Sequence, residues 1–227
     1  MTTTTMARTD EQLQRDVLAE MHWDARVHPN EIGVSAKDGV VTLTGWVDSY
    51  VKKWAAEEAA HRVRGVKAVA NDLEVRLPTA AERTDADLAA AATRALEWDA
   101  LVPSQNIHVT VTKGWVTLSG EVEWEFQRRS AKRAVRRLSG VRGVTNQISL
   151  RPRVKVDVAA ARDRIEEALI RAVDTPGERL SVTIEGDKVV LTGVVRSWRE
   201  REEAARVAWS TPGVMSVENR IVVMPDA

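Results

Sequence analysis

One frame of glycine and asparagine occurs three times along the chain at an identical spacing. In each copy a glycine precedes a second glycine by twenty residues and an asparagine by twenty-six, and the apolar positions between them also match. The three frames are Gly45, Gly65 and Asn71; Gly120, Gly140 and Asn146; and Gly193, Gly213 and Asn219. This recurrence indicates one unit of about 70 residues repeated in tandem.

The apolar pattern within one unit changes its period in a fixed order. Leu13, Val17 and Met21 recur at a spacing of four, which is typical of an amphipathic helix. Ile32, Val34 and Ala36 then alternate up to a turn at Lys37-Asp38-Gly39, which predicts a hairpin. After Gly45, apolar residues at helical spacing predict a second helix, and a segment rich in valine closes the unit as a strand. Each copy therefore reads as αββαβ.

This element order predicts an α+β fold of three domains, each a three-stranded mixed sheet covered by two helices. A β–α–β connection crosses over right-handed, which places the second helix on one face of the sheet. We expect Gly39 and Gly114 to supply positive φ in the hairpins, Gly45 to end its strand and Gly65 to cap the helix. Asn71 and its equivalents could occupy a bulge in the last strand. The boundaries we assign are a disordered N-terminus at 1–9 and domains at 10–77, 84–151 and 157–224.

The segments around these glycines resemble the BON domain family. The likeness rests on VTLTG or VTLSG at the end of the central strand, on helix ends that read RVRGVKAV, RLSGVRGV and STPGVMSV, and on a closing N-x-[LI]-x-[VL]. The family includes osmotically inducible periplasmic proteins. The resemblance implies a non-catalytic module that binds phospholipid surfaces, often in envelope maintenance under osmotic or other stress.

The residue inventory argues against an enzyme. The chain has no Cys, which excludes disulfides, zinc–thiolate sites and thiolate nucleophiles. Its four histidines stand in different contexts without the i, i+4 spacing of a helical metal site, and no nucleotide-binding or nucleophile-elbow motif occurs. We therefore expect no catalytic residues, no metal and no cofactor. Trp23 and Trp98 match between copies, and we expect them in the core or between copies.

Charge is distributed unevenly although the chain has 33 basic and 33 acidic residues. Residues 84–151 hold ten basic and seven acidic groups, whereas residues 10–77 hold nine and twelve. Six of the basic groups fall on the second helix of the middle copy, at i, i+1, i+4, i+5, i+8 and i+9, which makes two adjacent rows on one face. They are Arg128, Arg129, Lys132, Arg133, Arg136 and Arg137.

Like charges four residues apart destabilise a helix by a few tenths of a kcal/mol, so a double row of cations favours a binding role. We predict that the six cations contact an anionic phospholipid surface, with Trp124 and Phe126 just before them as candidates for the membrane interface. The alternatives are a small ligand or monovalent cation, and a scaffold for an acidic protein partner. Nucleic acid ranks below lipid because the flanking copies are acidic.

The N-terminal residues and the hydropathy bear on location. No apolar run approaches the length of a transmembrane helix, and the first sixteen residues lack a basic segment followed by an apolar one. We therefore expect no signal peptide and a cytoplasmic location, with a periplasmic one as the alternative that the resemblance implies. The oligomeric state stays open.

Overall fold

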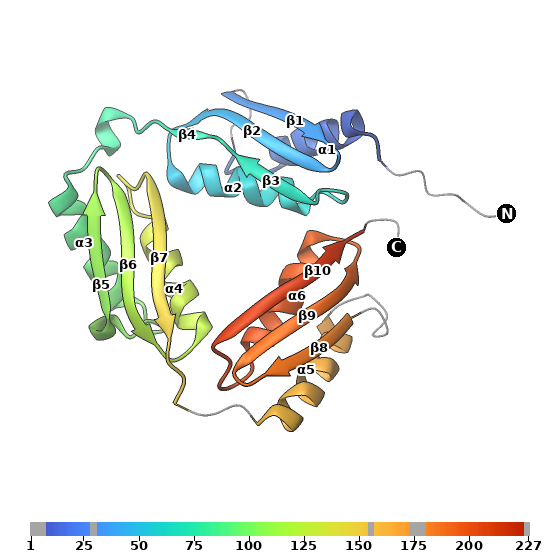
Figure 1. The fold of residues 1–227 in the computed structure, drawn as a ribbon. Helices are drawn as coiled ribbons and strands as arrows, with labels where there is room; N and C mark the ends of the chain where they lie inside the picture. Colours follow the sequence, from blue (N-terminus) through green and yellow to red (C-terminus); the bar gives the residue numbers. More distant parts are fainter. Residues whose placement is uncertain (1–7, 28–30, 154–156, 173–179, 225–227) are drawn as a thin grey trace. The chain divides into compact units, whose positions relative to one another are not determined.

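The computed structural model describes residues 8–27, 31–153, 157–172 and 180–224. Each repeat folds as helix, hairpin, helix and closing strand (Figure 1). The first repeat consists of α1 (Asp10–Trp23), β1 (Ile32–Lys37), β2 (Val40–Val47), α2 (Tyr50–Arg62), β3 (Ala68–Asn71) and β4 (Glu74–Val75). The second consists of α3 (Asp85–Trp98), β5 (Ile107–Thr112), β6 (Trp115–Val122), α4 (Glu125–Arg136) and β7 (Gly143–Leu150). The third consists of α5 (Val158–Ala172), β8 (Leu180–Glu185), β9 (Lys188–Val195), α6 (Trp198–Trp209) and β10 (Ser216–Val223).

The sheets are mixed, as the element order predicts. In the second repeat β6 lies in the centre, antiparallel to β5 and parallel to β7. The third repeat has the same arrangement around β9, and the first has it around β2, with β3 and β4 sharing the last position. The predicted α+β fold with three αββαβ units is confirmed. The expected disorder at 1–9 falls mainly on residues 1–7, outside the described ranges, and Thr9 is the N-cap of α1.

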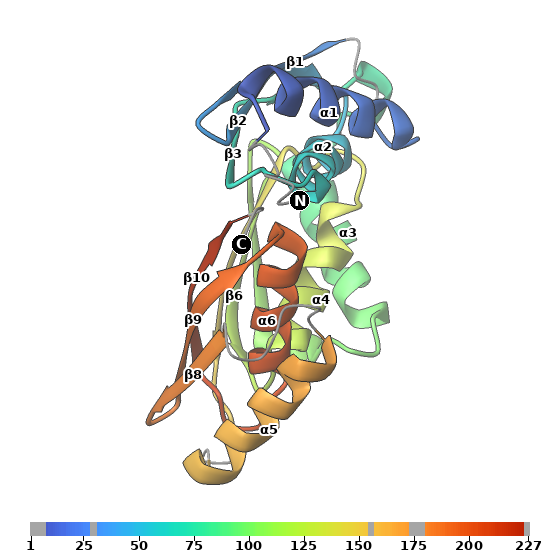
Figure 2. The ribbon, with the colours of Figure 1, turned by 90° about the vertical axis from the view of Figure 1, so that its right-hand side faces the viewer.

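Both helices of a repeat pack on one face of its sheet, and the core lies between the helices and the sheet. In the second repeat the core contains Leu96 of α3, Leu118 of β6 and Ile148 of β7, each at most 2% exposed. Figure 2 shows the same layering in the third repeat, where α5 and α6 lie side by side against β8, β9 and β10. Within the described residues, the opposite face of each sheet carries no helix of its own repeat.

The hairpin turns depend on left-handed backbone, as predicted. Lys113 and Gly114 have φ angles of 51° and 78°, and Asp38 and Gly39 of the first repeat have 52° and 82°. The carboxylate of Asp85, at the start of α3, accepts hydrogen bonds from the N–H groups of Lys113 (2.8 Å) and Gly114 (2.9 Å). The first helix of the repeat is thereby tied to the hairpin turn.

Gly45 and the asparagines have other roles than the sequence suggested. Gly45 does not end its strand, because β2 continues through Val47 and Gly45 pairs with Ile32. Asn146 forms no bulge, since β7 pairs with β6 without interruption. Its Nδ2 donates to the carbonyl of Arg128 (2.8 Å) and its Oδ1 accepts from the N–H of Ile148 (3.2 Å), which joins the last strand to α4. Asn219 makes the same pair of bonds in the third repeat.

Trp23 and Trp98 are not core residues. Their exposed fractions are 87% and 88%. Leu88, Ala92 and Leu96 form the buried row of α3, and Trp98 lies two residues beyond Leu96, off that row.

Candidate functional site

Helix α4 begins at a polar cap. Trp124 is the N-cap residue, and the side-chain oxygen of Gln127 accepts hydrogen bonds from the N–H groups of Glu123 (3.1 Å) and Trp124 (3.0 Å). Glu125 in the first turn adds a negative charge where the helix dipole favours one. This cap fixes where the helix starts and therefore which residues face the sheet.

The buried face of α4 leaves its cations in two rows on the outside. Ser130, Ala131 and Val135 are buried against the rest of the repeat. The outer row, exposed to solvent, consists of Arg129, Arg133 and Arg137. The inner row, half-buried, consists of Arg128, Lys132 and Arg136. The structure thus brings all six predicted cations onto one helix surface, which we call the basic surface.

The two rows differ in their partners. In the inner row, Arg128 forms an ion pair with Glu125 at 2.5 Å, and the guanidinium of Arg136 lies 3.4 Å from the ring centroid of Trp54. In the outer row, Arg133 reaches the hydroxyl of Ser130 at 3.4 Å. Within the described ranges, no carboxylate forms an ion pair with Arg129, Lys132, Arg133 or Arg137. These four cations are available to an external anion.

Arg128 occupies a position that the other repeats use for their own structure. The corresponding residues are Lys53 and Arg201, eight residues after the first glycine of each frame. Lys53 donates to the carbonyl of Leu73 (2.7 Å), and Arg201 donates to the carbonyls of Ile221 (3.0 Å) and Asn219 (2.9 Å). A cation at this position is therefore common to all three repeats and does not distinguish the second.

The four cations of α4 without a carboxylate partner are, as a set, specific to the second repeat. Glu202, Ala205, Arg206 and Ser210 stand at these positions in the third repeat, and Trp54, Glu57, Glu58 and Arg62 in the first. Arg206 pairs with Glu203, and Arg62 pairs with Glu20 and Asp24. The matching helices thus carry acidic residues or paired cations where α4 carries unpaired ones.

The predicted interface residues lie at the N-terminal end of α4. The rings of Trp124 and Phe126 stack with centroids 6.4 Å apart. Trp124 is half-buried, whereas Phe126 is 50% exposed. Phe126 is therefore exposed, and Trp124 is shared between the helix cap and the surface; a contact of either with a membrane stays a prediction.

Two further apolar side chains lie at the same end of the second repeat, and sequence reasoning missed them. The start of α3 binds the β5–β6 turn through Asp85, and the hydroxyl of Ser139, just after α4, lies 3.4 Å from the carbonyl of Ala81, just before α3. The two helices are therefore antiparallel, and the end of α3 lies beside the start of α4, as Figure 1 shows. Trp98 and Leu101 are exposed there by 88% and 49%. The spacing of the buried row in α3 was the signal that could have identified Trp98.

Helix length and the placement of potential metal ligands bear on two further classes of site. Every helix in the described part of the chain is too short or too polar to cross a bilayer. Among the residues that the structure describes, no three His, Asp or Glu side chains gather as metal ligands would.

Comparison with known proteins places these features in a family. The model of the BON domain matches residues 9–76, 84–152 and 157–225. The osmotically-inducible protein Y of Escherichia coli (strain K12) is 31% identical over 128 residues, which cover 54% of this chain and 63% of that relative's length.

Two solved structures of CdsD, a structural protein of the type III secretion system of Chlamydia trachomatis, are 13% identical with a TM-score of 0.27. They cover 92% and 96% of this chain, and 91% and 100% of their own, and a TM-score of this size does not establish a shared arrangement. The three consecutive family matches, in contrast, span most of the sequence. The chain belongs to the BON domain family and carries three copies in tandem.

Proposed function

We propose that this chain is a non-catalytic binding protein of the stress response, and that its second repeat docks on anionic phospholipid surfaces through the basic surface of α4. The similarity to an osmotically-inducible protein supports the stress association. The observation that carries the docking proposal is the set of four cations on α4, Arg129, Lys132, Arg133 and Arg137, that no carboxylate of the described chain neutralises.

The size of the basic surface suits a membrane. Residues 129 and 137 are eight positions apart, so the outer row extends for about 12 Å along the helix. Each Lys or Arg near an anionic bilayer contributes about 1 kcal/mol, so four of them give roughly 4 kcal/mol before screening and ordering reduce it. This is enough for reversible docking with the helix lying along the surface.

The exposed apolar side chains at one end of the second repeat supply a second contact. Phe126, Trp98 and Leu101 lie where α3 ends and α4 begins. Tryptophan suits the depth of lipid headgroups because its ring is apolar and its N–H is a hydrogen-bond donor. Docking would therefore combine a charged row with an apolar end, as in amphipathic elements that lie in the interface plane.

Vesicle flotation tests the proposal. The chain should float with vesicles that contain phosphatidylglycerol or cardiolipin, should stay behind with phosphatidylcholine vesicles, and should bind less as salt rises. Changing Arg129, Lys132, Arg133 and Arg137 to Glu should abolish the binding.

The matched control reverses four exposed cations on other elements: Lys37, Arg94, Arg164 and Arg199. This control changes the net charge by the same amount but leaves the cations of α4 in place. It should therefore retain most of the binding. Equal loss in both variants would reduce the effect to net charge and contradict a site on α4. An acidic protein partner would use the same surface, and it becomes the better explanation if no anionic vesicle binds. Fractionation of a tagged chain tests the predicted cytoplasmic location against the periplasmic alternative.

A further inference from the structure

The sheet face of the second repeat that carries no helix is unusually rich in uncharged polar groups. Alternation along the strands directs Val116 and Leu118 to the core, so Thr117 and Ser119 face the other way. Their cross-strand partners Thr110 and His108 on β5, and Thr145 and Gln147 on β7, share that face. The face thus presents many hydroxyl, amide and imidazole groups that both donate and accept hydrogen bonds.

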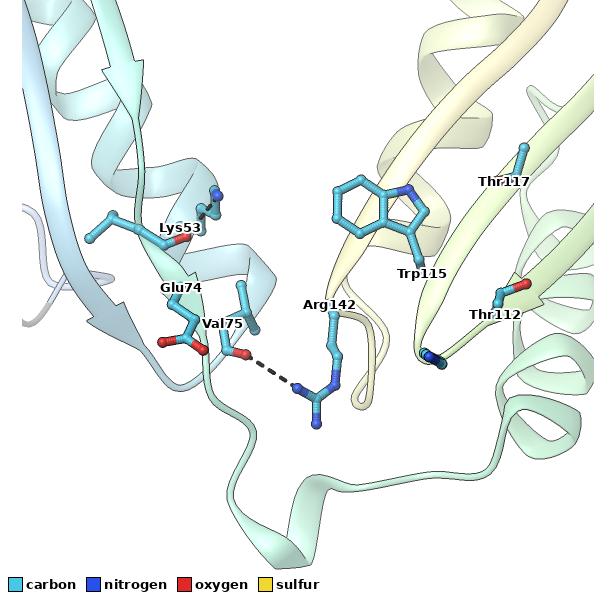
Figure 3. Close-up of a pocket in the computed structure, with 9 residues that line it drawn as sticks. Lys53, Glu74, Val75, Thr112, Trp115, Thr117 and Arg142 are labelled. Carbon is cyan, nitrogen blue, oxygen red and sulfur yellow. Dashed lines mark hydrogen bonds between the residues drawn. The ribbon is translucent and has the colours of Figure 1, made fainter.

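One aromatic ring lies on this polar face and is held in a fixed orientation. Trp115, the first residue of β6, is 49% exposed. Its indole Nε1–H donates to the hydroxyl of Thr145 at 2.8 Å. A Cβ at Gly143 would lie only 2.4 to 2.7 Å from three atoms of the ring, so the ring covers Gly143 closely. Figure 3 shows the indole over β7, with Thr117 on the same strand as Trp115.

The neighbouring repeats lack this arrangement. The residues that match Trp115 are Val40 and Lys188, and those that match Gly143 are Ala68 and Ser216. In the third repeat, Lys188 and Arg220 form ion pairs with Glu218. The pinned indole is therefore a feature of the second repeat alone.

A hollow of about 560 Å³ adjoins the ring. It lies within the compact unit formed by residues 46–54 and 73–153. The second repeat lines it with Trp115, Thr112, Thr117, Lys113 and Arg142, and Lys53 and residues 73–75 line it as well (Figure 3). The exposed face of the indole thus borders a space in which a ligand can lie.

From this geometry we propose that the open sheet face of the second repeat binds an oligosaccharide, with one pyranose ring stacked on Trp115. The face of an indole carries negative charge density and attracts the weakly positive C–H groups on the flat side of a sugar ring. The hydroxyls of Thr112 and Thr117 border the same hollow and can exchange hydrogen bonds with sugar hydroxyls. Because the ring is already held by Thr145 and Gly143, binding orders few further groups.

A nucleic acid base could also stack on an indole, but the rest of the face does not suit it. Single-stranded nucleic acid requires a cationic groove along the backbone. Here the cations lie only at the two ends of the face, with Lys113 and Arg142 at one end and Arg151 at the other. Arg142 lies 3.8 Å from Glu82, and Arg151 forms an ion pair with Glu121 at 2.9 Å. The groups between these two ends, such as Thr117, Ser119 and Thr145, are neutral.

The test follows the Trp115 indole resonance of the full-length chain by NMR during titration with cellohexaose, chitohexaose and maltohexaose. At least one of them should shift the resonance saturably at millimolar concentration. Trp115→Ala should weaken the affinity, measured by calorimetry, at least tenfold. Gly143→Ala keeps the indole but forces it off the sheet, and it should weaken the affinity as well. Trp98→Ala, an exposed indole elsewhere in the same repeat, should bind as the parent does.

Three results would overturn the proposal: no shift with any of the three sugars, full affinity in Trp115→Ala and Gly143→Ala, or a tighter response to a DNA oligonucleotide. Circular dichroism of each variant checks its fold, and Thr117→Val removes a hydroxyl without altering the ring. The variant in which the four cations of α4 are changed to Glu should still bind sugar as the parent does. This proposal and lipid docking can therefore fail separately.

Discussion

Gly120 stands at the closest approach of two chain segments in the second repeat. Its φ is 128°, and a Cβ there would lie 2.0 Å from the carbonyl oxygen of Asn106. We expect Gly120→Ala to destabilise the repeat by about 2–4 kcal/mol, because both the backbone and the contact become strained. Gly186 has a φ of 64° with nothing near its Cβ position, so Gly186→Ala should cost only about 1 kcal/mol.

Amide hydrogen exchange in β6 and in β9 measures these two effects separately. A similar loss of protection in both repeats would show that left-handed backbone, and not the contact with Asn106, explains the glycine of the repeated frame.

Asp24 gives the first repeat a response to acid. The hydrogen bonds from the Arg26 side chain lower the pKa of its carboxyl most, and burial opposes them with the next largest effect. Further hydrogen bonds from the Arg26 backbone and the Arg62 side chain keep this pKa well below the usual range. Because the folded-state pKa is lowered, the stabilisation is complete above the unfolded pKa of about 3.9 and is lost as pH falls through the folded value. Asp24→Asn should therefore destabilise the repeat at pH 7, by about 1–2 kcal/mol, and much less near pH 2.

Urea unfolding of parent and variant at both pH values, with hydrogen exchange of α1 to localise the change, measures this. A difference that is the same at pH 7 and pH 2 would mean that the charge of Asp24 does not matter.

At the scale of single residues, the sequence predicted the backbone conformation of the hairpin glycines better than the roles of Gly45 and Trp98. The hairpin glycines were predicted because a two-residue turn demands positive φ. The role of Gly45 could not be predicted, since it depends on how closely the segment before β1 approaches β2. Trp98 was misplaced because the match between Trp23 and Trp98 outweighed the spacing of the buried row.

Repulsion between like charges lowers the stability of helix α4. Arg133 has Arg129 and Arg137 four residues away on either side, and like charges at this spacing are unfavourable. Arg133→Glu should stabilise α4 by roughly 0.5–1 kcal/mol, because two repulsive pairs become attractive. The same change should weaken flotation with anionic vesicles.

Hydrogen exchange of α4 and flotation together check this prediction. A variant that is less stable, or one that is more stable but still binds vesicles fully, would contradict the view that stability is lost here in favour of binding. Arg133→Ala is the control, since it removes the repulsion without adding attraction.

The elements themselves were predictable because each apolar pattern occurs three times and the copies agree. What no pattern could reveal is how a helix is joined to the closing strand. Asn146 links β7 to the carbonyl of Arg128, and only the parallel pairing of β7 with β6 brings those groups together. The basic surface was predictable as a pattern on one helix, whereas the polar sheet face required the register of three strands.

For the whole molecule, the family and the number of repeats follow from the sequence, and the comparisons confirm both. The boundaries at 10–77, 84–151 and 157–224, the cytoplasmic location and the ligand stay predictions. Formal net charge was a poor guide, because a value of zero conceals a middle repeat that is basic and a first repeat that is acidic.

Helices α4 and α6 have similar buried residues, each within its own repeat, so the exposed residues of one helix can be transferred to the other. The buried face of α6 contains Ala204, Val207 and Ala208, and the buried face of α4 contains Ala131 and Val135. Changing Glu202 to Arg, Ala205 to Lys and Ser210 to Arg should give the third repeat its own attachment point. If linker geometry lets both points engage one vesicle, apparent affinity in a vesicle co-sedimentation assay should rise at least tenfold. Triplication thus leaves two copies to keep the architecture while another acquires new specificity.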